Sequence, residues 1–180
     1  MTTISTATKP ARAVSTPAPT THYDLGLLIL RLALGLTMAA HGTQKLFGWF
    51  SGGGIDGTAA FFTMSGYPAG RTMATIAGLT ETFGGLAMAL GLLTPLAGAA
   101  LVGTLLNALA VKWGNGFFAP KGVEYELFLV AAAIALTLTG PGRYAADRSL
   151  PALRDHRLVY GLAALTLALA SAAIVLLIRN

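Results

Sequence analysis

Five polar side chains that could hold a ligand or move a proton lie inside or at the ends of long apolar segments of this chain. They are His41, Lys45, Glu81, Asn107 and Glu126. Imidazole and carboxylate groups serve as general acids and bases, whereas an amide or an ammonium group can hold a carbonyl oxygen. Polar groups inside a membrane are costly unless they face protein, ligand or water. The set therefore indicates proton exchange with a bound ligand.

The elements that must position these groups are apolar helices. The chain is 180 residues long, 54% hydrophobic and only 11% charged, which is too little charge to cover a soluble domain. The apolar residues form continuous blocks rather than the alternation of a β-barrel, and about 20 of them cross a bilayer. We therefore expect an all-α, polytopic membrane helix bundle. Its predicted spans are 25–46, 72–93, 94–113, 122–139 and 158–178.

The loops of this bundle divide between two faces. Side A carries the N-terminal tail, the Thr94-Pro95 turn and the loop 140–157, whereas side B carries the other loops and the C-terminus. The arginines of the loop 140–157 favour a cytoplasmic side A, and thus a cytoplasmic N-terminus. We expect a multi-pass protein of the bacterial inner (plasma) membrane. On side B, Asp56 could N-cap a short helix that carries Phe61 and Phe62 and covers the bundle.

Counting helix rise places the polar groups at similar depths. From side B, Glu126 lies about 6 Å down, His41 about 7 Å, Asn107 about 9 Å and Glu81 about 13 Å. Four helices thus contribute to one polar layer. Arg31 lies deeper, nearer side A, and is a possible ion-pair partner of Glu81, with Lys45 or His41 as the partner of Glu126. Such pairs could instead be structural pins that fix the helix register.

Other residues have weaker signals. Tyr125 could donate a hydrogen bond into the layer. The side B aromatics Trp49, Phe50, Trp113, Phe117 and Phe118 could form either an interfacial belt or a ligand box. No metal site is expected, because His22 and His156 lie on side A, away from His41. The chain has no cysteine, which excludes thiol catalysis and an iron–sulfur cluster held by this chain. The net charge of +5 is scattered, so nucleic acid is not an expected partner.

At these residues the sequence resembles the DoxX family. The matching stretches are Arg31-Leu-Ala-Leu-Gly35, His41-Gly-Thr-Gln-Lys45-Leu-Phe-Gly-Trp-Phe50, Gly57-Thr-Ala-Ala-Phe-Phe62, Glu81-Thr-Phe-Gly-Gly85, Gly91-Leu-Leu-Thr-Pro95, Asn115-Gly-Phe-Phe118, Glu124-Tyr-Glu126 and Gly140-Pro-Gly-Arg-Tyr144. The resemblance implies a four-helix core over residues 23–148. The chain departs from the family pattern, because its composition predicts a disordered tail (1–22) before this core and a linker with a fifth transmembrane helix (149–180) after it. The small residues of that fifth helix could dock on the bundle or recruit a partner.

The resemblance implies a membrane component of an oxidoreductase system, and two interpretations follow. In the first, the chain is a quinone-linked subunit in thiosulfate, sulfur or oxidative-stress redox. No covalent cofactor is expected; a quinone would bind beneath Phe61 and Phe62, near Trp49, Phe118 and Tyr125. His41 and Glu126, with Glu81 behind them, would exchange its protons, and Asn107 or Lys45 would hold a carbonyl oxygen.

In the second interpretation the chain is a non-catalytic membrane anchor. It would gather soluble redox enzymes such as a sulfurtransferase or superoxide dismutase. A small-solute or proton pathway through Glu81 is a third, less supported interpretation, because no broken helix or inverted repeat is evident. The bilayer is a partner in every case, and the sequence leaves a homo-oligomer open.

Overall fold

The computed structural model describes residues 21–179, and this part of the chain is helical without strands. The elements are α1 (Thr21–Phe47), α2 (Gly54–Met64), α3 (Gly70–Leu90), α4 (Thr94–Lys112), α5 (Glu124–Thr139), the short 3-10 helix η1 (Ala146–Ser149) and α6 (Leu158–Leu177). The predicted helical bundle is confirmed. The predicted tail 1–22 falls almost wholly outside the described residues, and α1 begins within its last two positions.

Four of these helices, namely α1, α3, α4 and α6, are long and apolar enough to cross a membrane within the described part of the chain. The predicted fourth span coincides with α5, but α5 has only 16 residues. At 1.5 Å per residue it spans about 24 Å, which is less than the hydrocarbon core. Gly140 and Pro141 follow directly and prevent a further turn.

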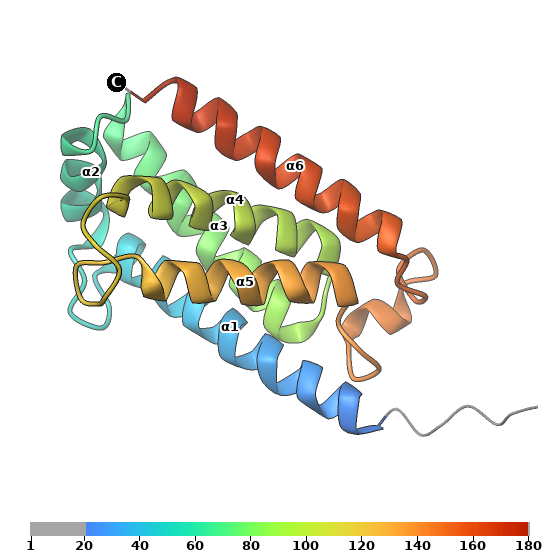
Figure 1. Ribbon diagram of the computed structural model, residues 1–180. Coiled ribbons are helices and arrows are strands. Elements are labelled where there is room, and N and C mark those ends of the chain that lie inside the picture. Colours follow the sequence, from blue (N-terminus) through green and yellow to red (C-terminus); the bar gives the residue numbers. More distant parts are fainter. Residues whose placement is uncertain (1–20, 180) are drawn as a thin grey trace, which may run out of the picture.

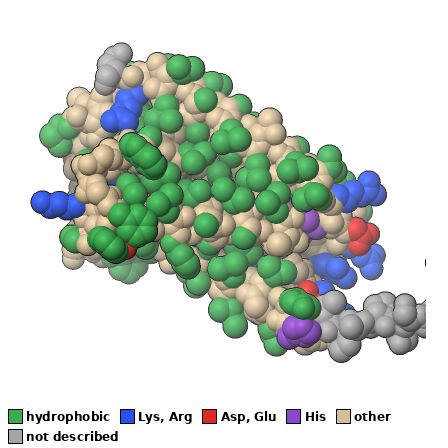
Figure 2. Space-filling view, viewed as in Figure 1, with side chains coloured by type: hydrophobic (Ala, Val, Ile, Leu, Met, Phe, Trp, Pro, Cys, Tyr) green, Lys and Arg blue, Asp and Glu red, His purple; other side chains and the backbone are tan. Residues whose placement is uncertain are grey.

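The long helices lie alongside one another, and α2 lies across one end of the bundle (Figure 1). That end, side B, also holds the end of α6, whereas side A holds the start of α1 and the start of α6. Charged side chains gather at the two ends, with a hydrophobic surface between them (Figure 2). This is the surface expected of a multi-pass membrane protein. The cytoplasmic location of side A stays a prediction.

The helices α1 and α3 meet along a seam of glycines. A Cβ atom on Gly35 would lie 2.5 Å from the carbonyl oxygen of Gly85, and one on Gly42 would lie 2.6 Å from that of Gly78. Real Cβ atoms do not approach backbone so closely, so these positions require glycine. The small-residue stripes of the two helices therefore bring their backbones into direct contact.

The last helix, α6, packs on the bundle through its small residues. Gly161, Ala164, Ala168 and Ala172 are all buried. A Cβ on Gly161 would lie 2.5 Å from the carbonyl oxygen of Thr137 in α5. The sequence left two roles open for this face, docking on the bundle or recruiting a partner. In the structure the face docks on the bundle.

The loop 140–157 is fastened to side A by Arg31. This buried guanidinium donates a hydrogen bond from Nη1 to the carbonyl oxygen of Pro141 (3.3 Å) and another from Nη2 to that of Tyr144. The predicted Arg31–Glu81 pair is therefore wrong. Arg31 lies too near side A to reach Glu81, and its Nη1 and Nη2 bond to loop carbonyls instead.

Two buried carboxylates complete the attachment of this loop. Asp147 accepts hydrogen bonds from the backbone nitrogens of Leu93 (2.6 Å) and Thr94 (2.9 Å), and so satisfies free amides at the start of α4. Asp24 accepts one from the backbone nitrogen of Arg143 (2.9 Å). Together with Arg31, these residues form what we call the side A cluster.

The predicted N-cap of the side B helix is also wrong. The helix α2 starts at Gly54, with Gly53 at the N-cap and no side-chain cap. Asp56 lies in the first turn instead, and its Oδ1 is 2.5 Å from Nη1 of Arg71. The glycine run lets the chain turn into the helix before Asp56, because Gly54 adopts a positive φ of 59°.

Candidate functional site

A cavity of about 500 Å³ lies at the side B end of the bundle. Its walls come from α1, α3, α4, α5 and α6, and Phe61 and Phe62 of α2 also line it. The four residues of the predicted layer, His41, Glu81, Asn107 and Glu126, all line it, together with Lys45. Helix depth and helical face thus predicted their convergence.

Each of the two buried carboxylates in this cavity is paired with a lysine. Lys45 Nζ lies 2.5 Å from Glu81 Oε2, and Lys112 Nζ lies 2.6 Å from Glu126 Oε1. Glu81 is only 4% exposed and Glu126 only 6%. The lysine partner offsets the cost of burying each carboxylate.

The predicted partner of Glu126 was Lys45 or His41, and this prediction is wrong. Lys45 lies opposite Glu81 across the seam between α1 and α3, and its ammonium group is engaged there. Lys112 ends the third span, so the sequence marked it only as a basic residue of side B. Its long apolar stem lets the ammonium group fold back toward the bundle, as lysines at helix ends do.

The second oxygen of Glu126 has no partner. Oε2 is buried and accepts no hydrogen bond from the protein. Arg31 Nε and Thr94 Oγ1 are buried without partners as well, but neither residue lines the cavity. An unpartnered buried acceptor calls for a donor from a ligand or from water. The first turn of α5, where Glu126 lies, also favours negative charge because of the helix dipole.

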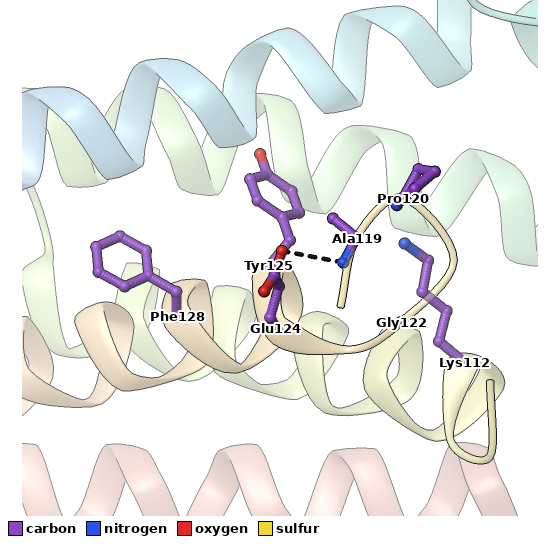
Figure 3. A pocket seen from close by; sticks show the side chains of 7 residues that line it. All are labelled: Lys112, Ala119, Pro120, Gly122, Glu124, Tyr125 and Phe128. Atoms are coloured by element: carbon purple, nitrogen blue, oxygen red, sulfur yellow. Dashed lines mark hydrogen bonds between the residues drawn. The ribbon is translucent and has the colours of Figure 1, made fainter. Parts of the chain in front are cut away.

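His41 makes a direct contact with Tyr125. Its Nε2 lies 2.9 Å from the Tyr125 hydroxyl in a hydrogen bond, and the two rings meet edge to face with centroids 5.8 Å apart. Tyr125 does not line the cavity. It lines a neighbouring recess of about 520 Å³ with Lys112, Ala119, Pro120, Gly122, Glu124 and Phe128 (Figure 3). The predicted hydrogen bond of Tyr125 thus reaches the cavity by way of His41.

Asn107 is held by a residue that the sequence did not single out. The Tyr67 hydroxyl donates to Asn107 Oδ1 (3.2 Å), and Asn107 Nδ2 donates to the carbonyl oxygen of Gly103 (3.0 Å). This arrangement leaves the second hydrogen of the amide for a ligand. Tyr67 lies in the turn between α2 and α3, where nothing in the local sequence marks it as a cavity residue.

The C-terminal Arg179 covers Tyr67. Its guanidinium carbon lies 5.6 Å from the centre of the tyrosine ring, and its Nε donates to the carbonyl oxygen of Ser65 (2.7 Å). Burial raises the pKa of Tyr67 above its ordinary value, and the positive charge of Arg179 offsets part of that rise. The residue that follows α6 therefore packs on Tyr67, one of the residues that line the cavity.

Two aromatic residues that the sequence predicted to bind a ligand lie outside the cavity. Trp49 is 58% exposed and packs on Phe47, and Phe118 is 77% exposed and packs on Phe117. Neither lines the cavity. Their exposure at side B fits the interfacial belt, which was the other interpretation of this set. The cavity is also lined by Thr80, Thr104 and Ser171, which the sequence analysis missed.

Residues 21–179 contain no group of three or more His, Asp or Glu side chains that could hold a metal ion. The cavity is mainly apolar, and its polar lining residues include Glu126, Asn107 and His41. Such a pocket suits a small amphipathic organic ligand. Its location fits a ligand that partitions into the bilayer.

These features define a multi-pass helical membrane protein with a cluster of polar residues at the end of the bundle that α2 covers. Comparison with known proteins makes the assignment more specific. The DoxX family model matches residues 26–113. The chain is 31% identical over 126 residues to the "Putative oxidoreductase CatD" of Bacillus subtilis (strain 168), a match that covers 69% of this chain and 87% of that protein. The chain belongs to the DoxX family. No solved structure matches it.

Proposed function

We propose that the side B cavity binds the head group of a membrane quinone, and that the protein is the membrane subunit of an oxidoreductase system that reduces it. The observation that carries the proposal is the unpartnered Oε2 of Glu126, a residue that lines a mainly apolar cavity. A quinol hydroxyl would donate to that oxygen. A hydrogen bond to a buried carboxylate is among the stronger ones in proteins.

The other polar groups of the cavity supply what a quinone ring requires. A quinone has two carbonyl oxygens, which accept hydrogen bonds before reduction and become hydroxyl donors afterwards. Asn107 has a spare amide hydrogen, and the lysines that pair with Glu81 and Glu126 are positive charges beside the site. The ring itself would contact Phe61, Phe62 and the apolar walls.

Reduction is balanced by two electrons and two protons, which convert both carbonyl groups of the quinone into hydroxyls. His41 and Glu126 are the proton-exchanging groups in this proposal. The electrons come from a soluble oxidoreductase partner that oxidises a reduced-sulfur anion, which is the donor class that the family resemblance implies. The name of the Bacillus subtilis relative, "Putative oxidoreductase CatD", supports the same class of function.

Binding of decylubiquinol, the reduced form whose hydroxyls can donate to Glu126, to the purified protein in anaerobic lipid nanodiscs tests this proposal. We expect saturable binding of one molecule per chain, weakened at least about tenfold by Glu126→Gln, because a charge-assisted hydrogen bond contributes roughly 1.5–3 kcal/mol. The matched control is Asp56→Asn, which also removes a carboxylate from an ion pair on side B, but outside the cavity. This control should bind like the wild type.

Two outcomes would contradict the proposal. One is the absence of saturable binding to the wild-type protein, and the other is equal affinity of the Glu126→Gln variant. If soluble redox enzymes co-purify with the Glu126→Gln variant as well as with the wild type while no decylubiquinol binds, the anchor interpretation replaces this one.

A further inference from the structure

The cavity and the recess beside it are separate hollows that share a wall. Lys112 lines both, whereas His41 lines only the cavity and Tyr125 only the recess. The hydrogen bond between His41 Nε2 and the Tyr125 hydroxyl, 2.9 Å long, joins a lining residue of the cavity to a lining residue of the recess. In Figure 3 the Tyr125 side chain extends from the first turn of α5 toward α1, the helix that carries His41.

This pair has the chemistry of a proton relay. An imidazole can take a proton on one ring nitrogen and release one from the other, and a phenol hydroxyl both donates and accepts. The recess contains Lys112 and the carboxylate of Glu124, whose Oε1 accepts a hydrogen bond from the Ala119 backbone nitrogen (2.9 Å). These charged groups place the recess where the bilayer meets water rather than among lipid tails.

We infer that His41 and Tyr125 form the route by which protons pass between the cavity and the water on side B. The inference rests on the proposed function, since the protons are those of the bound quinone. A proton taken from water by the Tyr125 hydroxyl replaces the one that the hydroxyl passes to His41 Nε2, and His41 releases a proton to the reduced quinone oxygen. Quinone reduction then consumes protons from side B.

The charged groups around the pair are balanced. Lys45 and Lys112 face the cavity from α1 and α4, and Glu81 and Glu126 face it from α3 and α5. Each lysine is bonded to one of the carboxylates. A proton that crosses from Tyr125 to His41 therefore enters a cavity without an excess of fixed positive charge.

The test is Tyr125→Phe, which keeps the ring against His41 and removes only the hydroxyl. The protein is adsorbed on an electrode in its lipid nanodisc with decylubiquinone bound, so that the electrode supplies both electrons and no partner is required. We expect decylubiquinone affinity within about twofold of the wild type and a reduction rate about 100-fold lower, the scale of a lost acid–base group. The matched control is Tyr144→Phe, on side A, whose rate should not change.

A kinetic isotope effect separates a proton route from a merely structural role. In heavy water, reduction by the Tyr125→Phe variant should show a larger solvent isotope effect than the wild type, because proton delivery becomes limiting. The double variant His41→Gln/Tyr125→Phe should be no slower than His41→Gln alone, since both changes interrupt one route.

The outcomes distinguish this inference from the proposed function. A Tyr125→Phe variant that binds decylubiquinone and reduces it at the wild-type rate overturns the proton route and leaves quinone binding intact. Additive rate losses in the double variant also overturn it. A wild-type protein that binds no decylubiquinone overturns both.

Discussion

The two ends of the bundle bury the same kinds of charged side chain and use them differently. In the side A cluster, Arg31 and Asp147 bond to backbone carbonyls and amides of the loop 140–157 and the start of α4. In the side B cavity, Lys45 and Lys112 bond to carboxylates, and one carboxylate oxygen stays unpartnered. Charges bonded to backbone hold a loop in place, whereas charges bonded to each other around a hollow can exchange a partner or a proton.

This difference also distinguishes stability from function. A buried ion pair by itself indicates only that the burial of charge is compensated. What marks side B as a site is the combination of a cavity of about 500 Å³, contributions from several helices and the unpartnered oxygen of Glu126. The side A residues lack this combination, because none of them lines the cavity.

The largest effect on stability is expected at side A. Asp147→Ala removes two charge-assisted hydrogen bonds and leaves the Leu93 and Thr94 amides without partners, so the free energy of unfolding should fall by about 3 kcal/mol. Thermal unfolding in detergent measures this change, with the exposed Asp155→Ala as its control. Decylubiquinone affinity of the folded variant should stay unchanged. A loss of affinity with intact folding would remove the division between the two ends.

A charge reversal at side B sharpens the same division. Glu81→Lys places two ammonium groups together and should cost about 2–3 kcal/mol, whereas Lys45→Glu/Glu81→Lys restores an attractive pair and should recover part of that loss. Thermal unfolding of the two single variants and the double variant measures the recovery. If the double variant recovers none of the lost free energy of unfolding, the Lys45–Glu81 pair does not form. The control is Arg31→Glu/Glu81→Lys, because Arg31 and Glu81 are not paired in the structure.

A pH titration probes the cover of the cavity. Burial raises the pKa of the Tyr67 phenol, so the folded state favours the neutral form. The resulting stability is complete below the ordinary tyrosine pKa of about 10 and is lost as the pH rises through the higher folded value. Unfolding measured from pH 9 to 12 should show this loss in the wild type and a smaller one in Tyr67→Phe. Identical slopes would contradict it.

The smallest effect is expected at the exposed ion pair of side B. Asp56 and Arg71 are 2.5 Å apart, but their side chains are 82% and 69% exposed. Asp56→Asn should therefore change the free energy of unfolding by no more than about 0.5 kcal/mol. Chemical denaturation of the purified variant measures this value. A cost above about 1 kcal/mol would show that short distance alone, without burial, gives an ion pair its strength.

The sequence predicted the helices and the depth of the polar layer because both follow from local periodicity. The span 158–178 and the helix Leu158–Leu177 differ by one residue at the end, since a continuous apolar block has few alternative structures. Depth depends only on the rise per residue, so His41, Asn107 and Glu126 could be placed together without knowing which helices are neighbours.

The pairing of charges could not be predicted in the same way. Depth made Arg31 and Glu81 plausible partners, but contact also depends on helix rotation and on loops folded back from distant sequence. Pro141 and Tyr144 take the Arg31 donors from more than a hundred residues away. Tyr67 and Arg179 were missed for the same reason, because their contact joins a turn to the end of the chain.

The seam between α1 and α3 has a mechanical consequence. Backbone touches backbone at Gly35 and Gly85, and again at Gly42 and Gly78, so neither helix can roll or slide against the other without a steric clash. The two helices therefore behave as one rigid unit, which fixes the distance between His41 in α1 and Glu81 in α3. Ser171, Ala172 and Val175 of α6 border the same cavity. A ligand that binds there meets groups of α1 and α3 whose spacing is set before it arrives.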